Sequence, residues 1–264
     1  MAVESPPHGH GDAVPDVTIV VTCYNEEKYI TKTIEVVLSA LHEAGCTHEI
    51  IVIDDVSRDR SIQVIKDYIR DHPGAPVQLV ANQRNRGLAQ NYVEGAFLGR
   101  GKYYRLCPGD DSEPKDALVR LFRCLGKADI IIPYHVVVGR SLLRKALSFT
   151  YTKLVNLISG YRIKYYNGLA IHLRHNVMRR HPSSYGFGFQ ADILTHLLEE
   201  GCSYAQILSS SVERKGDGST ALNVRNLLSI SHTLLEIAIR RVRRWIYGKD
   251  WPKPVEVHID PPTV

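Results

Sequence analysis

The sequence predicts an α/β protein with a doubly wound, mostly parallel sheet and helices on both faces. Short apolar runs of strand length alternate with segments whose apolar residues recur at helical spacing. Clusters of polar residues follow directly after several of the apolar runs. Because parallel strands end at the same edge of a sheet, we expect these clusters to meet at one ligand-binding edge.

The first half of the chain contains five predicted strands separated by four predicted helices. The strands cover residues 17–22, 49–54, 77–81, 102–107 and 129–133. The helices cover residues 30–41, 62–69, 88–98 and 114–125. The last of these helices opens with Pro114, which suits the first position of a helix. Helices of this length between strands indicate parallel crossover connections.

After residue 134 the alternation becomes irregular. The predicted elements are a helix at 140–159, a strand at 168–173, a helix at 190–200, a strand at 203–214 and an amphipathic helix at 222–247. We therefore expect one domain, a C-terminal amphipathic helix and a loose tail at each end. The bounds are 1–15 for the first tail, 16–220 for the domain (halves 16–134 and 135–220), 221–250 for the helix and 251–264 for the last tail.

Composition excludes several classes of protein. The 264 residues are 44% hydrophobic and 23% charged, as in an ordinary globular protein. No run of 18 apolar residues suggests a membrane-spanning helix, and residues 1–15 lack the apolar core of a signal peptide. The five cysteines form no CxxC pair and the twelve histidines form no HExxH motif, so we expect reduced thiols and no zinc site.

The charge distribution is more informative than the net charge of +5. The stretch 130–191 holds nine Lys and Arg residues and no Asp or Glu. Such a stretch indicates either an anionic partner near the middle of the chain or a solvated basic face. We expect no nucleic-acid partner. A dinucleotide-dependent oxidoreductase is disfavoured, because "CYNEE" rather than a glycine-rich loop follows the first strand.

Six motifs in order give the chain a family resemblance. They are "VVTCYNEE", "IIVIDDVSRDRS", "NRGLAQNYVEGAFLGRGKY", "PGDDSEP", "GFGFQADI" and "VERKGDGS". The chain resembles family 2 glycosyltransferases with the Rossmann-like glycosyltransferase A fold, above all dolichol-phosphate mannosyltransferases and polyprenyl-phosphate glycosyltransferases. The resemblance implies a UDP- or GDP-sugar donor bound by residues 16–134, an acceptor bound by residues 135–220, and a divalent cation, Mg²⁺ or Mn²⁺.

The resemblance also implies a donor site. Acids of the first two motifs would meet the base and ribose, with Asp54 facing the base edge, because carboxylates accept hydrogen bonds from N–H and hydroxyl groups. For Asp55 and Ser57 a turn with a helix cap stays an alternative. The predicted donor residues are Tyr24, Asn25, Glu27, Asp54, Asp55, Asn85, Gly87, Asp110, Asp111, Arg214 and Ser219.

The motif "PGDD" falls where the family usually has Asp-x-Asp. Asp110 matches the second Asp, whereas Pro108 replaces the first. We expect Asp110, with help from Asp111, to hold a metal that stabilises the leaving nucleoside diphosphate. Glu113 has either a secondary role there or a capping role for the helix that begins at Pro114.

The late motif "VERKGDGS" implies that Arg214 contacts the donor phosphates, with Ser219 nearby. The family often has Lys after this Ser, and here Thr220 follows it, so Lys215 is the candidate substitute. A basic turn without ligand contact is the alternative. The predicted catalytic residues are Asp110, Asp192 and Arg214.

The acceptor side depends on the acceptor's chemistry. Gln190 and Asp192 match the acceptor motif, in which an acid serves as general base for a hydroxyl acceptor. A phosphate acceptor needs cations instead, because it is already largely dianionic at neutral pH. We predict Arg140 and Arg144 as its partners, with Arg162 and Lys164 as weaker candidates.

The predicted C-terminal helix is rich in arginine, at positions 240, 241, 243 and 244, and ends near Trp245. Such a basic amphipathic helix suits an anionic bilayer surface. Packing on the domain or on a dimer partner is the alternative, and both stay open here.

Together these features predict an inverting, metal-dependent hexosyltransferase. It would move a sugar from a UDP- or GDP-sugar to a polyprenyl phosphate or related lipid, at the cytoplasmic membrane face, in cell-envelope glycan synthesis. The alternatives are a hydroxyl acceptor with Asp192 as base, and a degenerate protein that binds nucleotide sugar or acts as a scaffold. A homodimer or an integral membrane partner stays open, as do the sugar, the nucleotide and the lipid.

Overall fold

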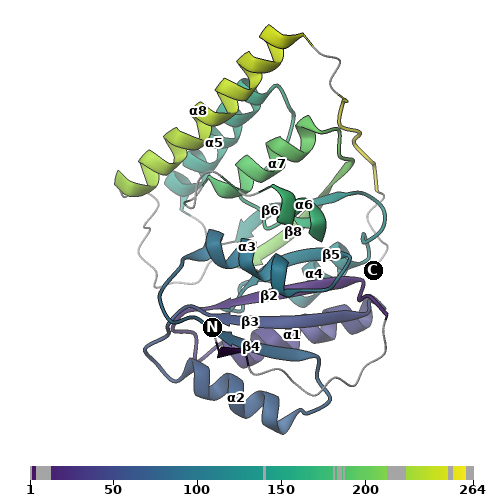
Figure 1. The fold of residues 1–264 in the computed structure, drawn as a ribbon, viewed down its shortest axis with the longest axis vertical. Helices are drawn as coiled ribbons and strands as arrows, with labels where there is room; N and C mark the ends of the chain where they lie inside the picture. The colour runs from purple at the N-terminus through teal and green to yellow at the C-terminus, as the bar shows by residue number, and fades with distance from the viewer. Residues whose placement is uncertain are drawn as a thin grey trace.

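A computed structural model describes residues 2–3, 13–138, 141–180, 182, 186, 188–212, 224–248 and 252–259 (Figure 1). The strands are β1 (Ala2–Val3), β2 (Val17–Cys23), β3 (His48–Asp54), β4 (Val77–Ala81), β5 (Tyr103–Pro108), β6 (Ile130–Val138), β7 (Ile171–Leu173) and β8 (Tyr204–Val212). The helices are α1 (Ile30–Glu43), α2 (Ser61–Asp71), α3 (Leu88–Leu98), α4 (Lys115–Phe122), α5 (Leu142–Ser159), α6 (Arg174–Arg179), α7 (Phe189–Glu199) and α8 (Val224–Tyr247).

The strands form one sheet in the order β1-β4-β3-β2-β5-β7-β6-β8. Strands β4, β3, β2 and β5 are parallel to one another. Strand β7 is antiparallel to both β5 and β6, and β6 is parallel to β8. Strands β6 and β8 therefore run in the same direction as β5. The predicted doubly wound, mostly parallel α/β fold is confirmed, and the carboxyl ends of six strands share one edge.

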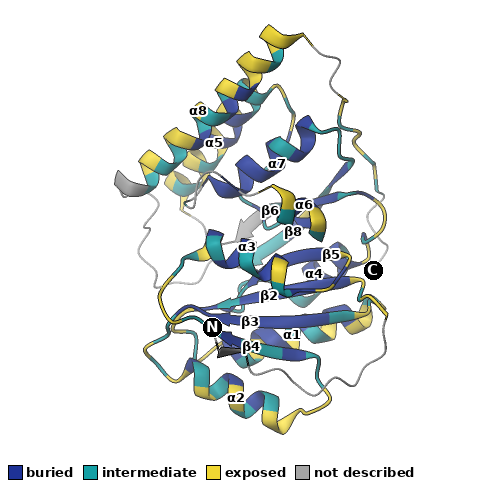
Figure 2. Ribbon diagram, in the orientation of Figure 1, coloured by how far each residue is buried: buried dark blue, intermediate teal, exposed yellow. Residues whose placement is uncertain are grey.

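Side-chain alternation along the strands builds a core on each face of the sheet. In β2, Ile19 and Val21 belong to the buried cluster under α1 and α4, whereas Val20 belongs to the buried cluster under α3 and α7. This is the period of two expected for a strand buried on both sides. Helices accordingly cover both faces, as predicted (Figure 2). The described part of the chain contains no helix that is both long and apolar enough to cross a bilayer.

The structure differs from the prediction in three peripheral segments. Within the expected N-terminal tail, Ala2–Val3 forms β1, which pairs antiparallel with β4 because the outer edge of β4 has backbone groups left to pair. The expected strand at 168–173 is shortened to β7, which leads directly into α6, a helix that the sequence pattern does not predict. The segment 252–259, expected as part of a loose tail, lies beside β8, where the backbone N–H of Val257 donates to the carbonyl oxygen of Tyr204 at 2.8 Å. The reason is the alternation in "VEVHI", which packs Val257 and Ile259 against the core.

A buried ion pair supports the loop that follows β5. Arg105 is fully buried in β5, and its guanidinium donates to the two carboxylate oxygens of Glu113 at 3.0 and 2.5 Å. It also donates to Cys107 Sγ at 2.7 Å and to the carbonyl oxygen of Leu169 at 3.2 Å. Glu113 is thus bound to the sheet, which replaces the expected capping or metal role with a structural one.

Removing Glu113 should leave the buried charge of Arg105 without a counterion. We expect Glu113→Ala to lower the free energy of unfolding by about 3–5 kcal/mol, measured by urea denaturation. The double variant Arg105→Met/Glu113→Ala should recover most of the loss, because it removes the buried charge itself. Glu43→Ala, which breaks the solvent-exposed pair with Lys115, serves as the control and should change stability little. Equal effects of Glu113→Ala and the double variant would contradict this explanation.

A second buried ionisable group lies between the sheet and α3. His172 of β7 is fully buried with its ring edge-on to Tyr92, and neither ring nitrogen has a hydrogen-bond partner among the described residues. Burial lowers the pKa of His172 to about 3. The ring is therefore neutral in the folded protein at every physiological pH.

His172 should make folding sensitive to mild acid. Between its unfolded pKa of about 6.5 and its folded pKa of about 3, only the unfolded chain binds the proton, so stability falls as the pH falls. His172→Phe should reduce the slope of unfolding free energy against pH by up to about 1.4 kcal/mol per pH unit in that window. Urea denaturation at a series of pH values measures the slope, and an unchanged slope would contradict the prediction.

Candidate functional site

A cleft of about 770 Å³ opens at the carboxyl edge of the sheet. The loops after β2, β3, β4 and β5 line it, so segments that are far apart in the chain meet there. Of the predicted donor residues, seven line the cleft: Tyr24, Asn25, Glu27, Asp55, Asn85, Gly87 and Asp110. The expected convergence of the first, second and fourth motifs on one rim is therefore observed.

Hydrogen bonds join the loop after β2 to the loop after β3. Asn25 Oδ1 accepts from the backbone N–H of Arg58 at 2.7 Å, and Glu27 Oε2 accepts from that of Arg60 at 2.9 Å. In return, the backbone N–H of Glu27 donates to Asp59 Oδ2 at 3.1 Å. The two loops form one continuous wall, rich in hydrogen-bond acceptors.

The neighbouring acids Asp54 and Asp55 have different surroundings. Asp54 is fully buried, and its carboxylate accepts from the backbone N–H of Ser57 at 3.0 Å and from the Ser57 hydroxyl. Asp55 lines the cleft, and its carboxylate accepts from the backbone N–H groups of Arg86 and Gly87, each at 2.8 Å. The geometry gives no support to Asp54 as the acid facing the base, because its carboxylate is turned to Ser57.

Left-handed backbone conformations gather at this edge. Three non-glycine residues among those described have positive φ: Asn25 at 60°, Val56 at 69° and Asp111 at 53°. They lie in the loops after β2, β3 and β5, respectively. The conformation is least favourable for Val56, because its side chain is β-branched. Backbone strain of this kind is typical of ligand-binding loops.

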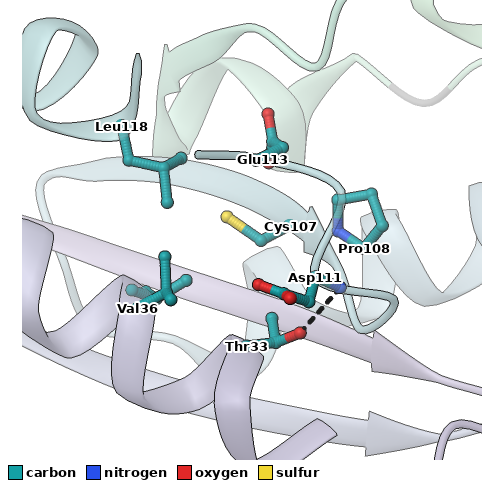
Figure 3. A pocket seen from close by; sticks show the side chains of 8 residues that line it. Thr33, Val36, Cys107, Pro108, Asp111, Glu113 and Leu118 are labelled. Atoms are coloured by element: carbon teal, nitrogen blue, oxygen red, sulfur yellow. Dashed lines mark hydrogen bonds between the residues drawn. The ribbon is translucent and has the colours of Figure 1, made fainter. Parts of the chain in front are cut away.

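The two acids of "PGDD" point in different directions. Asp110 lines the cleft, with Oδ1 accepting from the backbone N–H of Ser112 at 3.1 Å. Asp111 instead points into a small pocket between α1 and β5 (Figure 3). Its carboxylate lies 2.7 Å from Lys32 Nζ. Thr33 fixes this loop, because its hydroxyl donates to the carbonyl oxygen of Gly109 at 3.0 Å and accepts from the N–H of Asp111 at 2.9 Å.

The described residues fit a divalent cation that is held largely by its substrate. They contain no group of three His, Cys, Asp or Glu side chains able to hold a metal ion. Asp110 is the carboxylate that the "PGDD" loop presents to the cleft, whereas Asp111 is paired with Lys32. Mg²⁺ sites commonly use one or two carboxylates together with substrate phosphates. Asp110 meets that requirement, and the pairing of Asp111 argues against a direct ligand role for it.

Asp192 lies away from solvent in the acceptor half. Its carboxylate is fully buried and accepts from Arg240 Nη1 of α8 at 2.6 Å. The same guanidinium donates to Thr195 Oγ1 at 2.6 Å and pairs with Glu199 at 3.3 Å. Asp192 thus balances a buried cation between α7 and α8, which gives no geometric support to a general base.

The remaining acceptor and phosphate residues are only partly within the described structure. Gln190 is 2% exposed, and its amide has no hydrogen-bond partner among the described residues. Arg144 lies in the first turn of α5, and Lys164 Nζ lies 4.2 Å from the centre of the Tyr134 ring. Outside the described residues are Arg140, Arg214, Lys215, Ser219 and Thr220.

Two thiols lie near the cleft. Cys23 lines it, and Cys107 lies directly before Pro108. Burial raises the pKa of Cys23 to about 11 and that of Cys107 to about 12. Both are therefore protonated at neutral pH and are poor nucleophiles.

Sequence reasoning did not predict the supporting role of several residues, and it named Arg240 as a candidate for lipid contact instead. The supporting residues are Lys32 and Thr33 of α1, Arg105 of β5 and Arg240 of α8. Arg105 carried a usable signal, because a charged residue inside the apolar run "YYRLC" needs a buried partner. Thr33 carried no such signal, since it contacts a loop 76 residues away.

Comparison with known proteins agrees with this geometry. A family model described as "Glycosyl transferase family 2" matches residues 18–185, more than half of the chain. The succinoglycan biosynthesis protein ExoO of Rhizobium meliloti is 36% identical over 118 residues, which is 45% of this chain and 31% of that protein. Dolichyl-phosphate beta-glucosyltransferase of Dictyostelium discoideum is 25% identical over 165 residues, 56% of this chain and 50% of that enzyme. The chain thus spans about a third to a half of these relatives.

Solved structures share the fold at low identity. Glucosyl-3-phosphoglycerate synthase from Mycobacterium tuberculosis, in complex with Mg²⁺ and UDP, has a TM-score of 0.65 at 14% identity, covering 85% of this chain and 79% of that one. A mannosyltransferase from Pyrobaculum calidifontis, in complex with GDP-Man and Mn²⁺, has a TM-score of 0.59 at 18% identity, covering 90% and 68%. With its glycosyltransferase A fold and its matched motifs, the chain belongs to glycosyltransferase family 2.

Proposed function

We propose that this chain transfers a sugar from a nucleotide sugar to a polyprenyl phosphate or related lipid, with a divalent cation. The observation that carries the proposal is the cleft at the carboxyl edge of the sheet. Hydrogen-bond acceptor groups line this cleft, and the Asp110 carboxylate is among them. Relatives named as dolichyl-phosphate and undecaprenyl-phosphate transferases support the acceptor class. Structural neighbours in complex with UDP or GDP-Man and with Mg²⁺ or Mn²⁺ support the donor and the cation.

The wall formed by the loops after β2 and β3 suits the nucleoside. Carboxylate and amide oxygens of Asn25, Glu27 and Asp59 lie along it and accept hydrogen bonds. Base N–H groups and ribose hydroxyls are the matching donors. Asp110 would hold the cation, which when bound neutralises charge on the departing diphosphate. Arg214 and Ser219 stay proposed partners of the same phosphates.

The transfer is proposed as a single displacement with inversion. An acceptor oxygen forms a bond to the anomeric carbon while the bond from that carbon to the diphosphate oxygen breaks, and the electron pair leaves with the nucleoside diphosphate. A covalent sugar–enzyme intermediate on a thiol is disfavoured, because Cys23 and Cys107 are protonated.

A phosphate acceptor suits the acceptor half better than a hydroxyl acceptor. The carboxylate expected as general base, Asp192, is buried against Arg240. A phosphate is already largely ionised at neutral pH and needs no base. It needs cations, and the stretch 130–191 contains no acid that would oppose them. Arg144 and Arg140 stay the proposed phosphate partners, at the membrane face where a polyprenyl lipid is found.

Loss of Asp110 should remove the effect of metal on donor binding. UDP or GDP with Mn²⁺ should raise the melting temperature of the unmodified protein more than nucleotide alone. In Asp110→Asn the extra shift should disappear, and turnover of the nucleotide sugar should fall at least about 100-fold, as for loss of a strong electrostatic contact to the leaving group. Asp111→Asn is the control and should keep both. A metal-dependent shift that survives in Asp110→Asn would refute the role of Asp110.

Loss of Asp192 should separate the two acceptor chemistries. We expect Asp192→Asn to lower stability, because Arg240 keeps a buried charge without its counterion. Transfer to a prenyl phosphate per folded enzyme should fall less than about tenfold, with an unchanged pH profile. If the transfer rate of fully folded Asp192→Asn fell about 100-fold or more, with a changed pH profile, Asp192 would be identified as a general base. That result would favour the hydroxyl-acceptor alternative.

If the unmodified protein is folded but turns over no UDP- or GDP-sugar, the alternative of a degenerate protein that binds nucleotide sugar would be favoured.

A further inference from the structure

Helix α8 exposes an apolar stripe along its length. Its members follow one another at intervals of seven, four, three and four residues, so they lie on one side of the helix. They are Leu228, Leu235, Ile239, Val242 and Ile246, each at least half exposed. Trp245, which is 84% exposed, and Tyr247 extend the stripe at its end. This is the reverse of an ordinary surface helix, whose outer side is polar.

The opposite side of α8 is packed against the domain. Thr233 and Ile237 are fully buried, and Arg240 is bound to Asp192. Arg241 donates to the carbonyl oxygens of Leu157 and Ile158 at the end of α5, at 2.8 and 2.7 Å. Arg244 also donates to the Tyr161 hydroxyl oxygen at 3.0 Å, so three of the four arginines expected to meet lipid fix the helix to the protein. The stripe residues, by contrast, are exposed to solvent.

Helix α5 lies beside α8 and also exposes large apolar side chains. Leu142 and Leu157 are 83% and 75% exposed, and Phe149 is 63% exposed. The contact of Arg241 with the end of α5 holds the two helices together. We use the name α5–α8 face for Leu142, Leu143, Phe149, Leu154 and Leu157 together with the α8 stripe. Exposed apolar residues gathered in this way mark a binding surface.

The α5–α8 face begins near the catalytic edge. Strand β6 ends at Val138 and α5 begins at Leu142, so the start of α5 follows a carboxyl strand end. Because β6 runs parallel to β5, that strand end lies at the same edge of the sheet as Asp110. A substrate held on the face would therefore have its head near the edge that carries the cleft.

The charges around the face are positive. Lys145, Lys153 and Arg243 are exposed on α5 and α8, and Lys153 Nζ lies 5.3 Å from the centre of the Phe149 ring. Across both helices the single acid is Glu236, which lies 3.8 Å from His232. Two copies of this face related by a twofold axis would bring like charges together. An anionic partner would instead form favourable electrostatic interactions with these positive charges.

We propose that the α5–α8 face inserts into the surface of an anionic lipid bilayer. The proposal rests on the lipid acceptor proposed above. Leucines and isoleucines would enter the acyl boundary, Trp245 and Tyr247 would lie at the headgroup level, and the lysines would meet anionic headgroups. The bilayer would then deliver a membrane-bound acceptor to the catalytic edge.

Flotation of the full chain with vesicles tests this proposal. The unmodified protein should bind phosphatidylcholine vesicles that contain phosphatidylglycerol and should bind pure phosphatidylcholine vesicles much more weakly. Leu235→Gln/Ile239→Gln should weaken binding at least about tenfold, because two apolar side chains no longer enter the lipid. Lys145→Gln and Lys153→Gln should each weaken it about fivefold, and only with phosphatidylglycerol present.

The matched control is Val14→Gln/Val255→Gln, which replaces two side chains of comparable exposure elsewhere, 67% and 60% exposed. It should bind vesicles like the unmodified protein. All of the substituted side chains are solvent-exposed, and an unchanged melting temperature verifies folding. Absence of vesicle binding, or equal binding to both vesicle types, would overturn the proposal. A dimer interface at this face would also overturn it. In that case light scattering would show a dimer that Leu235→Gln/Ile239→Gln dissociates, and the unmodified protein would not bind vesicles.

A soluble acceptor separates this proposal from the proposed function. Without vesicles, Leu235→Gln/Ile239→Gln should transfer sugar to a short, water-soluble prenyl phosphate at the unmodified rate. Transfer without vesicle binding would refute only the α5–α8 face as a lipid surface. Vesicle binding without transfer to any acceptor would refute only the proposed function.

Discussion

The hydrogen bonds of Asp55 hold together the loops that line the cleft. Its backbone N–H donates to the carbonyl oxygen of Cys23 at 2.8 Å, which joins the end of β3 to the end of β2. Its carboxylate accepts from Asn82 Nδ2 at 2.9 Å and from the backbone N–H groups of Arg86 and Gly87. One 5% exposed residue thus links the loops after three strands. The shape of the cleft depends on this link, because each loop carries a left-handed or irregular backbone that would not keep its position alone.

Three ion pairs elsewhere in the molecule serve the structure. Lys32 is bound to Asp111, Arg105 to Glu113, and Arg240 to Asp192. Each pair has at least one nearly buried member, and a buried charge without its partner is strongly destabilising. Asp110 differs from these three acids, since it lines the cleft and accepts a hydrogen bond from the backbone N–H of Ser112. The cleft therefore presents the Asp110 carboxylate beside a wall of amide and carboxylate oxygens.

The sequence was sufficient for the fold and for the edge at which the site lies. Alternating apolar runs fix which segments are strands, and parallel strands bring their carboxyl ends together, so Asp55 and Asp110 were predicted at one rim. The direction of individual side chains was not predictable. Asp54 and Asp55 are adjacent, and their alternate directions give one to Ser57 and the other to the cleft. Asp192 depends on Arg240, which is 48 residues away and belongs to a helix whose arginines suggested lipid contact.

The contacts of Arg240 and Arg241 determine which side of α8 is exposed to a partner. In an amphipathic helix that binds lipid with the help of its basic side, the arginine side chains contact lipid headgroups instead of the protein. The apolar side chains of such a helix enter the bilayer. Here Arg240 and Arg241 are anchored on α7 and α5, so the helix cannot turn its basic side outward without breaking a buried ion pair. The outward side is apolar as a consequence of that anchoring. Helix α7 carries both Asp192 and Gln190, so the buried pair of Arg240 and Asp192 joins the helix with the predicted acceptor residues to the helix that bears the apolar stripe.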